Sequence, residues 1–256
     1  MSAFFGDLWY SARESLATLG RVFLFFFQLL AFTPAALWRF RLVVHQIFNA
    51  GALSLVIIMT CGLFVGMVLG LLGYDLLSRV ASEEILGAGA ALALTKQLGP
   101  VVTALLFAGR AGTALASELG LMRATDQFSA MQMMAVDPVR RVVVPRFLGG
   151  VIAMPCLTAI FISIAVFGVE LVGVEQVGID SGSFWSQMRS AVKLADIGEG
   201  LLKGAVFGIA CSLIAVYEGY NSVPTAEGVG RATTRTVVIS SVATLVLNFI
   251  LTAIML

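Results

Sequence analysis

Residues 46–74, QIFNAGALSLVIIMTCGLFVGMVLGLLGY, form a stretch of the chain without a charged side chain. About 20 consecutive apolar residues are enough for an α-helix to cross the hydrocarbon core of a bilayer. This stretch therefore predicts a membrane-spanning helix, and the same criterion predicts four more. The second of the five contains one charge, Lys96, and the fourth contains Lys203 and is short, so we expect its helix to begin earlier, near Asp196. The four further spans are residues 85–109, 147–169, 200–217 and 236–256.

The composition of the chain also indicates that lipid is its solvent. The 256 residues are 59% hydrophobic and 12% charged, whereas an average soluble domain carries roughly a quarter charged residues. Such a chain has too few polar groups to cover a surface in water. A net charge of +1 gives no reason to expect a nucleic-acid partner.

The N-terminal region contains a sixth apolar stretch, residues 22–38, which we interpret differently. Basic residues precede and follow it, so a span would place one basic group outside, whereas a helix lying in the interface keeps them on one side. Thr33 followed by Pro34 is typical of a helix start. We therefore predict one or two interfacial helices over residues 2–40. The N-terminal region of residues 1–45 and the five-span core of residues 46–256 form a single domain.

Charges between the predicted spans indicate the orientation. Loops on the cytoplasmic side are enriched in Lys and Arg, and this rule places the N-terminus in the cytoplasm and the C-terminus on the opposite side. The predicted external side carries Arg79, Arg189 and Lys193 among many acidic residues. The predicted cytoplasmic side carries Arg13, Arg21, Arg39, Arg41, Arg110, Arg123, Arg140, Arg141, Arg146, Arg231 and Arg235.

Three glycines spaced four residues apart share one face of the first predicted span: Gly62, Gly66 and Gly70. Missing side chains let a second helix approach closely, which favours helix association in lipid. The partner is either another span of the same chain or a second copy of it.

Polar residues interrupt three of the apolar spans. Lys96, followed by Gln97, lies near the middle of the second span, where a charge is costly and usually faces a cavity or a partner. We interpret Lys96 as lining a cavity in which it meets an anionic headgroup, and Pro100 removes a backbone donor just beyond it. Lys203 either has such a role or extends to the outer interface. Asn248 is typical of a hydrogen bond between helices.

Residues 117–146 link the second and third predicted spans on the cytoplasmic side. Their mixture of apolar and polar side chains is typical of a short amphipathic helix that begins near Thr125 and Asp126. Asp137 followed by Pro138 ends this helix, because the residue before proline avoids helical conformation. A short helix held at the membrane surface suits docking into a groove of a cytosolic partner. An ordinary surface helix is the alternative.

The sequence lacks the motifs of an enzyme. It has no GxxxxGK[ST] phosphate loop, no Gly-rich dinucleotide turn and no nucleophile beside a base. One His and three Cys, the cysteines scattered through apolar stretches, predict neither a metal site nor a disulfide framework. We therefore expect no catalytic residues, no metal and no bound cofactor, and any ATPase that drives transport is a separate chain.

Three groups of residues carry a family resemblance: LGPVVTALLFAGRAG at 98–112, ELGLMRATDQ at 118–127 with VDPVRR at 136–141, and AEGVGRATTR at 226–235. They resemble the MlaE-type permeases, the membrane subunits of an ABC transporter that maintains the lipid asymmetry of the outer membrane. The resemblance runs from about residue 40 to the end of the chain.

The resemblance implies an architecture and a set of partners. Each subunit is an all-α integral membrane protein of the bacterial inner membrane with an N-terminal interfacial helix, five transmembrane helices and a cytoplasmic coupling helix at about residues 118–134. Two subunits form a homodimer. Its implied partners are cytosolic ABC ATPase subunits that use ATP and Mg²⁺, periplasmic MCE-domain lipid-binding subunits, a STAS-domain protein attached through the ATPase, and phospholipid.

The resemblance also implies two sites. The first, second and fifth spans form most of a phospholipid cavity between the subunits, and the candidate lining residues are Leu69, Leu72, Lys96, Gln97 and Asn248. The candidate residues for ATPase docking are Glu118, Met122, Arg123, Asp126, Gln127 and Met131. The chain departs from the family pattern where Lys96 and Gln97 replace a frequent Arg-Glu pair, where Asn248 replaces an Asp found in some relatives, and where Asp126 replaces the usual Glu.

We therefore expect a membrane-spanning permease subunit that moves phospholipid between the inner membrane and periplasmic lipid carriers, driven by a separate ATPase. Three alternatives stay open. A secondary transporter of a small solute is disfavoured by five spans without a visible repeat. A membrane scaffold without its own transport cavity and a permease of the same family that carries sterols are the other two.

Overall fold

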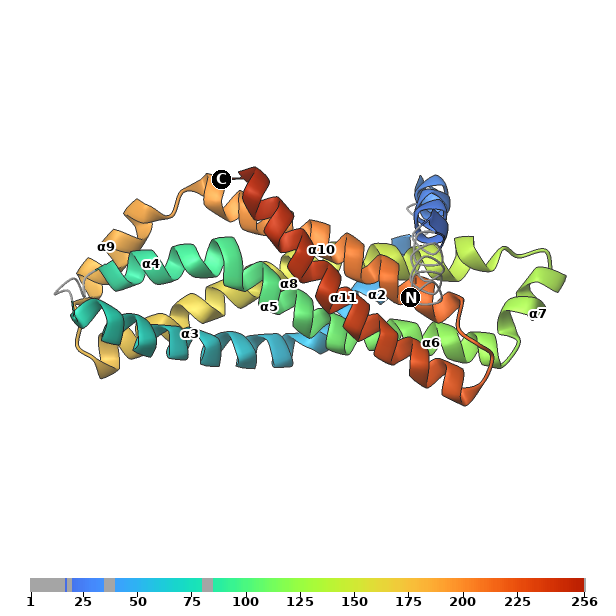
Figure 1. Cartoon of the computed structure of the whole chain (residues 1–256), viewed down its shortest axis with the longest axis horizontal. Helices are drawn as coiled ribbons and strands as arrows, with labels where there is room; N and C mark the ends of the chain where they lie inside the picture. Colours follow the sequence, from blue (N-terminus) through green and yellow to red (C-terminus); the bar gives the residue numbers. More distant parts are fainter. Residues whose placement is uncertain (1–16, 18–19, 35–39, 80–84, 256) are drawn as a thin grey trace, which may run out of the picture.

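The computed structural model describes residues 17, 20–34, 40–79 and 85–255, and the regular elements in these ranges are all helical. The prediction of five spans is confirmed, since five helices are long and apolar enough to cross a membrane. They run along the long axis of the molecule (Figure 1). Most reach beyond the charge-free stretches that predicted them. Spans 1 to 5 are Arg41–Ser78, Leu86–Ala124, Val139–Gln176, Leu194–Tyr220 and Ala226–Met255.

Span 1 is broken near its N-terminal end into α2 (Phe40–Ala50), the short turn η1 (Ala52–Ser54) and α3 (Leu55–Ser78). Backbone groups freed at a helix break need other partners inside a membrane. Arg110 supplies one, because its Nη1 donates to the carbonyl of Asn49 at 2.7 Å and to Ser54 Oγ at 3.1 Å. The second span was predicted to end at residue 109, and this predicted boundary is wrong. Arg110 lies within span 2, whose helix continues to Ala124.

Span 2 contains two widened π turns. Its segments are α4 (Leu86–Ala93), η3 (Leu94–Leu98), α5 (Gly99–Phe107), η4 (Ala108–Gly112) and α6 (Thr113–Ala124). Single π turns within α-helices occur frequently at functional sites, because the extra residue redirects the side chains around it. The first of these turns contains Lys96 and Gln97.

The predicted coupling segment forms two helices and not one. Span 2 ends with α6, a turn follows, and the short helix α7 (Gln127–Met133) begins after Asp126. Asp126 has a positive φ of 55°, and Ala135 beyond the helix has a φ of 56°. A continuous helix over 118–134 cannot pass through a left-handed residue, and Asp tolerates that conformation better than most residues. The start predicted near Thr125 and Asp126 agrees with α7.

The remaining helices complete spans 3 to 5. In span 3 the π turn η5 (Val139–Val143) leads into α8 (Val144–Glu170), which continues into η6 (Leu171–Gln176). The short helix α9 (Ser181–Ala191) follows at the end of the bundle away from α7 (Figure 1). The last two spans are α10 (Leu194–Tyr220) and α11 (Ala226–Met255).

The N-terminal helix Gly20–Pro34 is too short to span and runs across the long axis of the bundle (Figure 1). Its Phe25 packs against Tyr217 and Tyr220 of α10, with ring centroids 5.7 and 5.9 Å apart. The predicted helix start at Thr33 is wrong. Thr33 lies inside this helix, where its hydroxyl donates to the carbonyl of Leu29 at 2.9 Å. The rest of the predicted interfacial region, residues 1–16, 18–19 and 35–39, lies outside the described residues.

The three glycines of α3 pack against α8 of the same chain. A Cβ on Gly62 would lie 3.2 Å from the carbonyl oxygen of Phe161, and one on Gly66 would overlap the carbonyl of Ala165. One on Gly70 would lie 3.2 Å from Val172 Cβ. Of the two partners that the sequence left open, the structure places span 3 of the same chain against this face.

We predict that Gly66→Ala destabilises the folded protein by about 1–3 kcal/mol, because the new methyl group meets a backbone carbonyl that moves only if α8 moves. Thermal unfolding of the detergent-solubilised protein measures this effect. Gly109→Ala is the matched control, since a Cβ there meets no atom within 4 Å. Equal unfolding temperatures for the two variants would contradict the predicted close packing.

Candidate functional site

A cluster of charged residues joins span 2 to span 4. Lys96 Nζ lies 2.7 Å from Asp196 Oδ1 and 3.4 Å from Glu199 Oε2. Asp196 also caps α10, because its Oδ2 accepts from the backbone N–H of Lys193 at 2.9 Å. Lys96 is therefore an ion-paired residue in this structure and not an isolated cation.

Lys203 is the most buried charge of the cluster, at 2% exposure. Its Nζ donates to the backbone carbonyl of Lys96 and to Thr252 Oγ1, both at 2.9 Å. The carbonyl of Lys96 is available because the residue four positions later is Pro100, which has no N–H to donate to it. The side chain thus turns inward, and Lys203 does not extend to the outer interface.

Gln97 brings span 5 into the same cluster. Its Nε2 donates to Thr252 Oγ1 at 3.2 Å. Asn248 lies one helical turn before Thr252 on α11, and its Oδ1 is buried without a hydrogen-bond partner among the described residues. A cavity of about 70 Å³ opens nearby, and Asn248 is not part of its wall. The wall is formed by Lys96, Gln97, Glu199, Lys203, Thr252 and Met255.

The polar cluster, defined as Lys96, Gln97, Asp196, Glu199, Lys203 and Thr252, is balanced in charge. It contains two ammonium groups and two carboxylates, and three of its members come from span 4. A charge inside an apolar bundle is costly unless it is paired. The balance therefore lets four charged groups lie within apolar spans.

The two leucines proposed as cavity residues lie on α3, away from the polar cluster within one subunit. Leu69 is partly buried and packs against the core, whereas Leu72 is 60% exposed. In the described part of a single subunit, α3 packs chiefly against α8, and α11 against α10, α6 and α5. One subunit thus brings Lys96 and Gln97 near span 5 but does not bring the leucines to them.

The residues proposed for ATPase docking divide into anchoring and exposed groups. Glu118 accepts from Arg146 at 3.2 Å, and the Arg123 guanidinium lies 5.8 Å from the ring of Tyr220. Met122 and Met131 are partly buried against a core cluster that contains Phe128. Asp126 and Gln127 are exposed.

Three members of the polar cluster were missed by the sequence analysis as site residues: Asp196, Glu199 and Thr252. In the sequence the two carboxylates stand among the charges of a segment that was predicted to be external. Their spacing to Lys203, three and then four residues apart, places all three on one face of a helix, and this signal could have identified them. Thr252 carries no such signal.

The five apolar spans, with a partly buried polar cluster held between three of them, define a multi-pass integral membrane protein. The family model described as Permease MlaE matches residues 43–254. The chain therefore belongs to the MlaE permease family.

Individual relatives agree with this assignment. The chain is 52% identical over 238 residues to a protein of Haemophilus influenzae named intermembrane phospholipid transport system permease protein MlaE, covering 93% of this chain and 91% of the relative. It is 38% identical to a probable ABC transporter permease protein of Rickettsia bellii, covering 83% and 82%. It is 29% identical to the chloroplast protein TRIGALACTOSYLDIACYLGLYCEROL 1 of Arabidopsis thaliana, covering 84% of this chain and 61% of the relative.

We predict that Thr252→Val destabilises the protein by about 1–3 kcal/mol, because the buried ammonium of Lys203 loses one of its two acceptors. Thermal unfolding in detergent measures the change. Thr60→Val is the control, since the Thr60 hydroxyl donates to a carbonyl of its own helix. Similar losses of stability in both variants would contradict a special role for the hydrogen bond between Thr252 and Lys203.

Proposed function

We propose that this chain is the membrane-spanning permease subunit of an ABC-type transporter that moves phospholipid between the inner membrane and periplasmic lipid carriers. The observation that carries the proposal, together with family membership, is the polar cluster set among apolar spans. A phospholipid has the same division, with a polar headgroup and apolar chains. Binding pockets commonly combine apolar walls with a few well-placed polar groups.

The headgroup phosphate binds at Lys96 in this proposal. Lys96 is already paired with Asp196 and Glu199. The phosphate therefore replaces one of these carboxylates as the ion-pair partner of Lys96. Glu199 is the more weakly held partner, at 3.4 Å against 2.7 Å for Asp196. Gln97 and Lys203 supply further donors to phosphate or glycerol oxygens.

A homodimer completes the cavity in this proposal. The first and last spans present many large apolar side chains outward, such as Val56 at 74% and Phe249 at 75% exposure. Such faces contact either lipid or another helix, and van der Waals packing between helices contributes to association in a membrane. A second copy brings its own α3 toward the polar cluster, and this supplies the apolar walls to which Leu69 and Leu72 contribute.

The helix α7 is proposed as the docking element for a cytosolic ABC ATPase. Phe128 anchors it, being buried and 5.2 Å from the ring of Tyr220. Met133 and Met134 point outward, at 84% and 68% exposure. ATP and Mg²⁺ are used by that ATPase, to which a STAS-domain protein attaches, and MCE-domain lipid-binding subunits contact the opposite face.

The proposed location is the bacterial inner membrane, with the N-terminus in the cytoplasm and the C-terminus in the periplasm. The distribution of basic residues supports this orientation. The helix Gly20–Pro34 then lies in the cytoplasmic interface, which agrees with its direction across the bundle.

We predict opposite effects from two neutral substitutions in the polar cluster. Lys96→Gln lowers the number of phospholipids that copurify with the dimer, because the phosphate loses its cation. Glu199→Gln raises it, because a competing carboxylate is removed. Native mass spectrometry of the complex released in mild detergent, containing two permease and two ATPase chains, measures both.

Arg79→Gln is the control for these variants, since Arg79 is an exposed cation just beyond the end of α3 and lies outside the polar cluster. Among the described residues it pairs with Asp75 of α3 at 2.8 Å. Its lipid content should match that of the unmodified chain. If the unmodified chain and all three variants yield complexes without lipid, even after gentle extraction, the result would favour a scaffold over a lipid permease.

We predict that Met133→Asp abolishes recovery of the ATPase while the membrane protein stays folded, because a charge replaces the most exposed apolar contact of α7. Copurification from detergent measures recovery, and size-exclusion chromatography checks folding. Val223→Asp is the control, as Val223 is 62% exposed in the other cytoplasmic turn. Full ATPase recovery with Met133→Asp would contradict docking on α7.

A further inference from the structure

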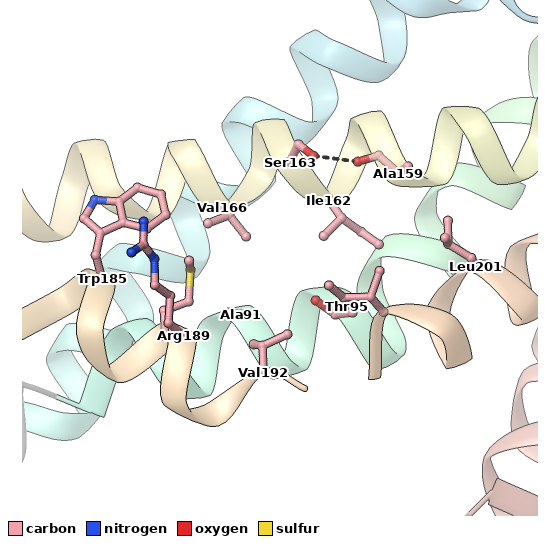
Figure 2. Close-up of a pocket in the computed structure, with 12 residues that line it drawn as sticks. Ala91, Thr95, Ala159, Ile162, Ser163, Val166, Trp185, Arg189, Val192 and Leu201 are labelled. Carbon is pink, nitrogen blue, oxygen red and sulfur yellow. Dashed lines mark hydrogen bonds between the residues drawn. The ribbon is translucent and has the colours of Figure 1, made fainter. Parts of the chain in front are cut away.

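A second and larger cavity lies on the flank of the bundle, separate from the polar cluster. Its volume is about 520 Å³, and it is enclosed by α4 and η3 of span 2, by α8, by α9 and by the first turns of α10. Thr95 lines this cavity, whereas the next residue, Lys96, turns to the polar cluster. We call it the lateral cavity (Figure 2).

The walls of the lateral cavity are apolar along most of their length. Ala91, Ile162, Val166 and Leu201 face one another across it (Figure 2). The hydroxyl of Ser163 already donates a hydrogen bond to the carbonyl of Ala159 at 2.9 Å, so its proton needs no acceptor on a ligand. An occupant therefore needs an apolar portion that reaches between α8 and α10.

The mouth of the cavity is formed by α9 and is polar. Trp185 is held there by a hydrogen bond from its Nε1 to Glu170 Oε1 at 2.8 Å. Arg189, one turn later on α9, is exposed and has no hydrogen-bond or ion-pair partner within the described ranges. A guanidinium binds phosphate with two parallel hydrogen bonds, and Trp is enriched at the membrane interface.

The depth of the cavity fits within one leaflet. From Ala159 to Val166 the wall follows eight residues of α8, which rise by about 10 Å. Half of the hydrocarbon core is about 15 Å thick. With the orientation proposed above, the cavity opens at the periplasmic interface and ends near the middle of the bilayer.

The size of the cavity favours a lipid chain over a helix from a partner protein. A helix with side chains is about 10–12 Å across and occupies roughly 500 Å³ in each turn of 5.4 Å. The cavity would hold a single turn, too little to seat a spanning helix along its length. Ligand pockets of roughly 300–1,000 Å³ are typical of small-molecule sites.

We propose that the lateral cavity binds one phospholipid of the periplasmic leaflet, with an acyl chain between α8 and α10 and its phosphate on Arg189. This site is distinct from the polar cluster and lies on the other side of η3. It goes beyond the proposed function, because it gives each subunit a lipid position open to the surrounding bilayer.

The test uses a phosphatidylglycerol that carries a photoreactive diazirine at the end of one acyl chain. The complete complex is reconstituted with this lipid in nanodiscs and irradiated, and adducts are mapped by peptide mass spectrometry. We expect adducts on residues 159–166 of α8. Arg189→Gln lowers their yield about tenfold, since a hydrogen bond to a charged group is lost, and Ala159→Trp removes them by filling the cavity.

Two matched controls retain the adducts. Lys193→Gln removes a neighbouring external cation outside the cavity, and Ile152→Trp adds the same bulk at an exposed position of α8. ATPase copurification verifies that each variant is folded, and Arg189→Gln alone tests the proposal if Ala159→Trp fails to fold.

Equal adduct yields in Arg189→Gln and Lys193→Gln would overturn the proposal. So would adducts that appear only when the periplasmic subunits are omitted, which would assign the cavity to a protein helix. Because the readout is on α8, loss of lipid from the polar cluster does not change it, and the two proposals fail separately.

Discussion

The close approach of α3 to α8 is the constraint on which the rest of the bundle depends. Apolar helices gain nothing from leaving lipid for one another, so they associate through packing and hydrogen bonds. Here the backbones meet directly: Gly66 faces the carbonyl of Ala165, and Gly168 of α8 in turn faces the backbone of α3. α8 also packs against α2, α5 and α10. These close glycine contacts therefore position span 1 on α8, which packs against several other helices of the bundle.

The polar cluster depends on a local irregularity of the backbone. Pro100 withholds a donor from the carbonyl of Lys96, and the π turn η3 contains both Lys96 and Gln97. The ammonium of Lys203 takes the place of the missing N–H. The break in the regular hydrogen-bond pattern of span 2 thus places an accepting carbonyl beside the buried lysine of span 4.

The spans were predictable because lipid excludes charge, and a chain folded in water rarely keeps 20 residues in a row free of it. The interior contacts were less accessible to sequence reasoning. The role of Arg110 depends on a break in a different span, so its position after an apolar stretch indicated only a loop. Asp196 and Glu199 stand among the charges of a segment that the sequence predicts to be external, although their spacing to Lys203 could have placed them on one helical face. The partners of Lys203 could not be inferred, since they come from spans 2 and 5.

The bracketing of α7 by two left-handed residues has a mechanical consequence. Asp126 and Ala135 isolate this helix from its neighbours in the chain, so it behaves as a separate rigid piece whose firmest hold is Phe128 against Tyr220. Tyr220 is the last residue of α10, and Asp196 is in the first turn of the same helix. A displacement of α7 therefore acts on one end of α10, which is about 40 Å long. The opposite end of α10 carries the carboxylates that form ion pairs with Lys96.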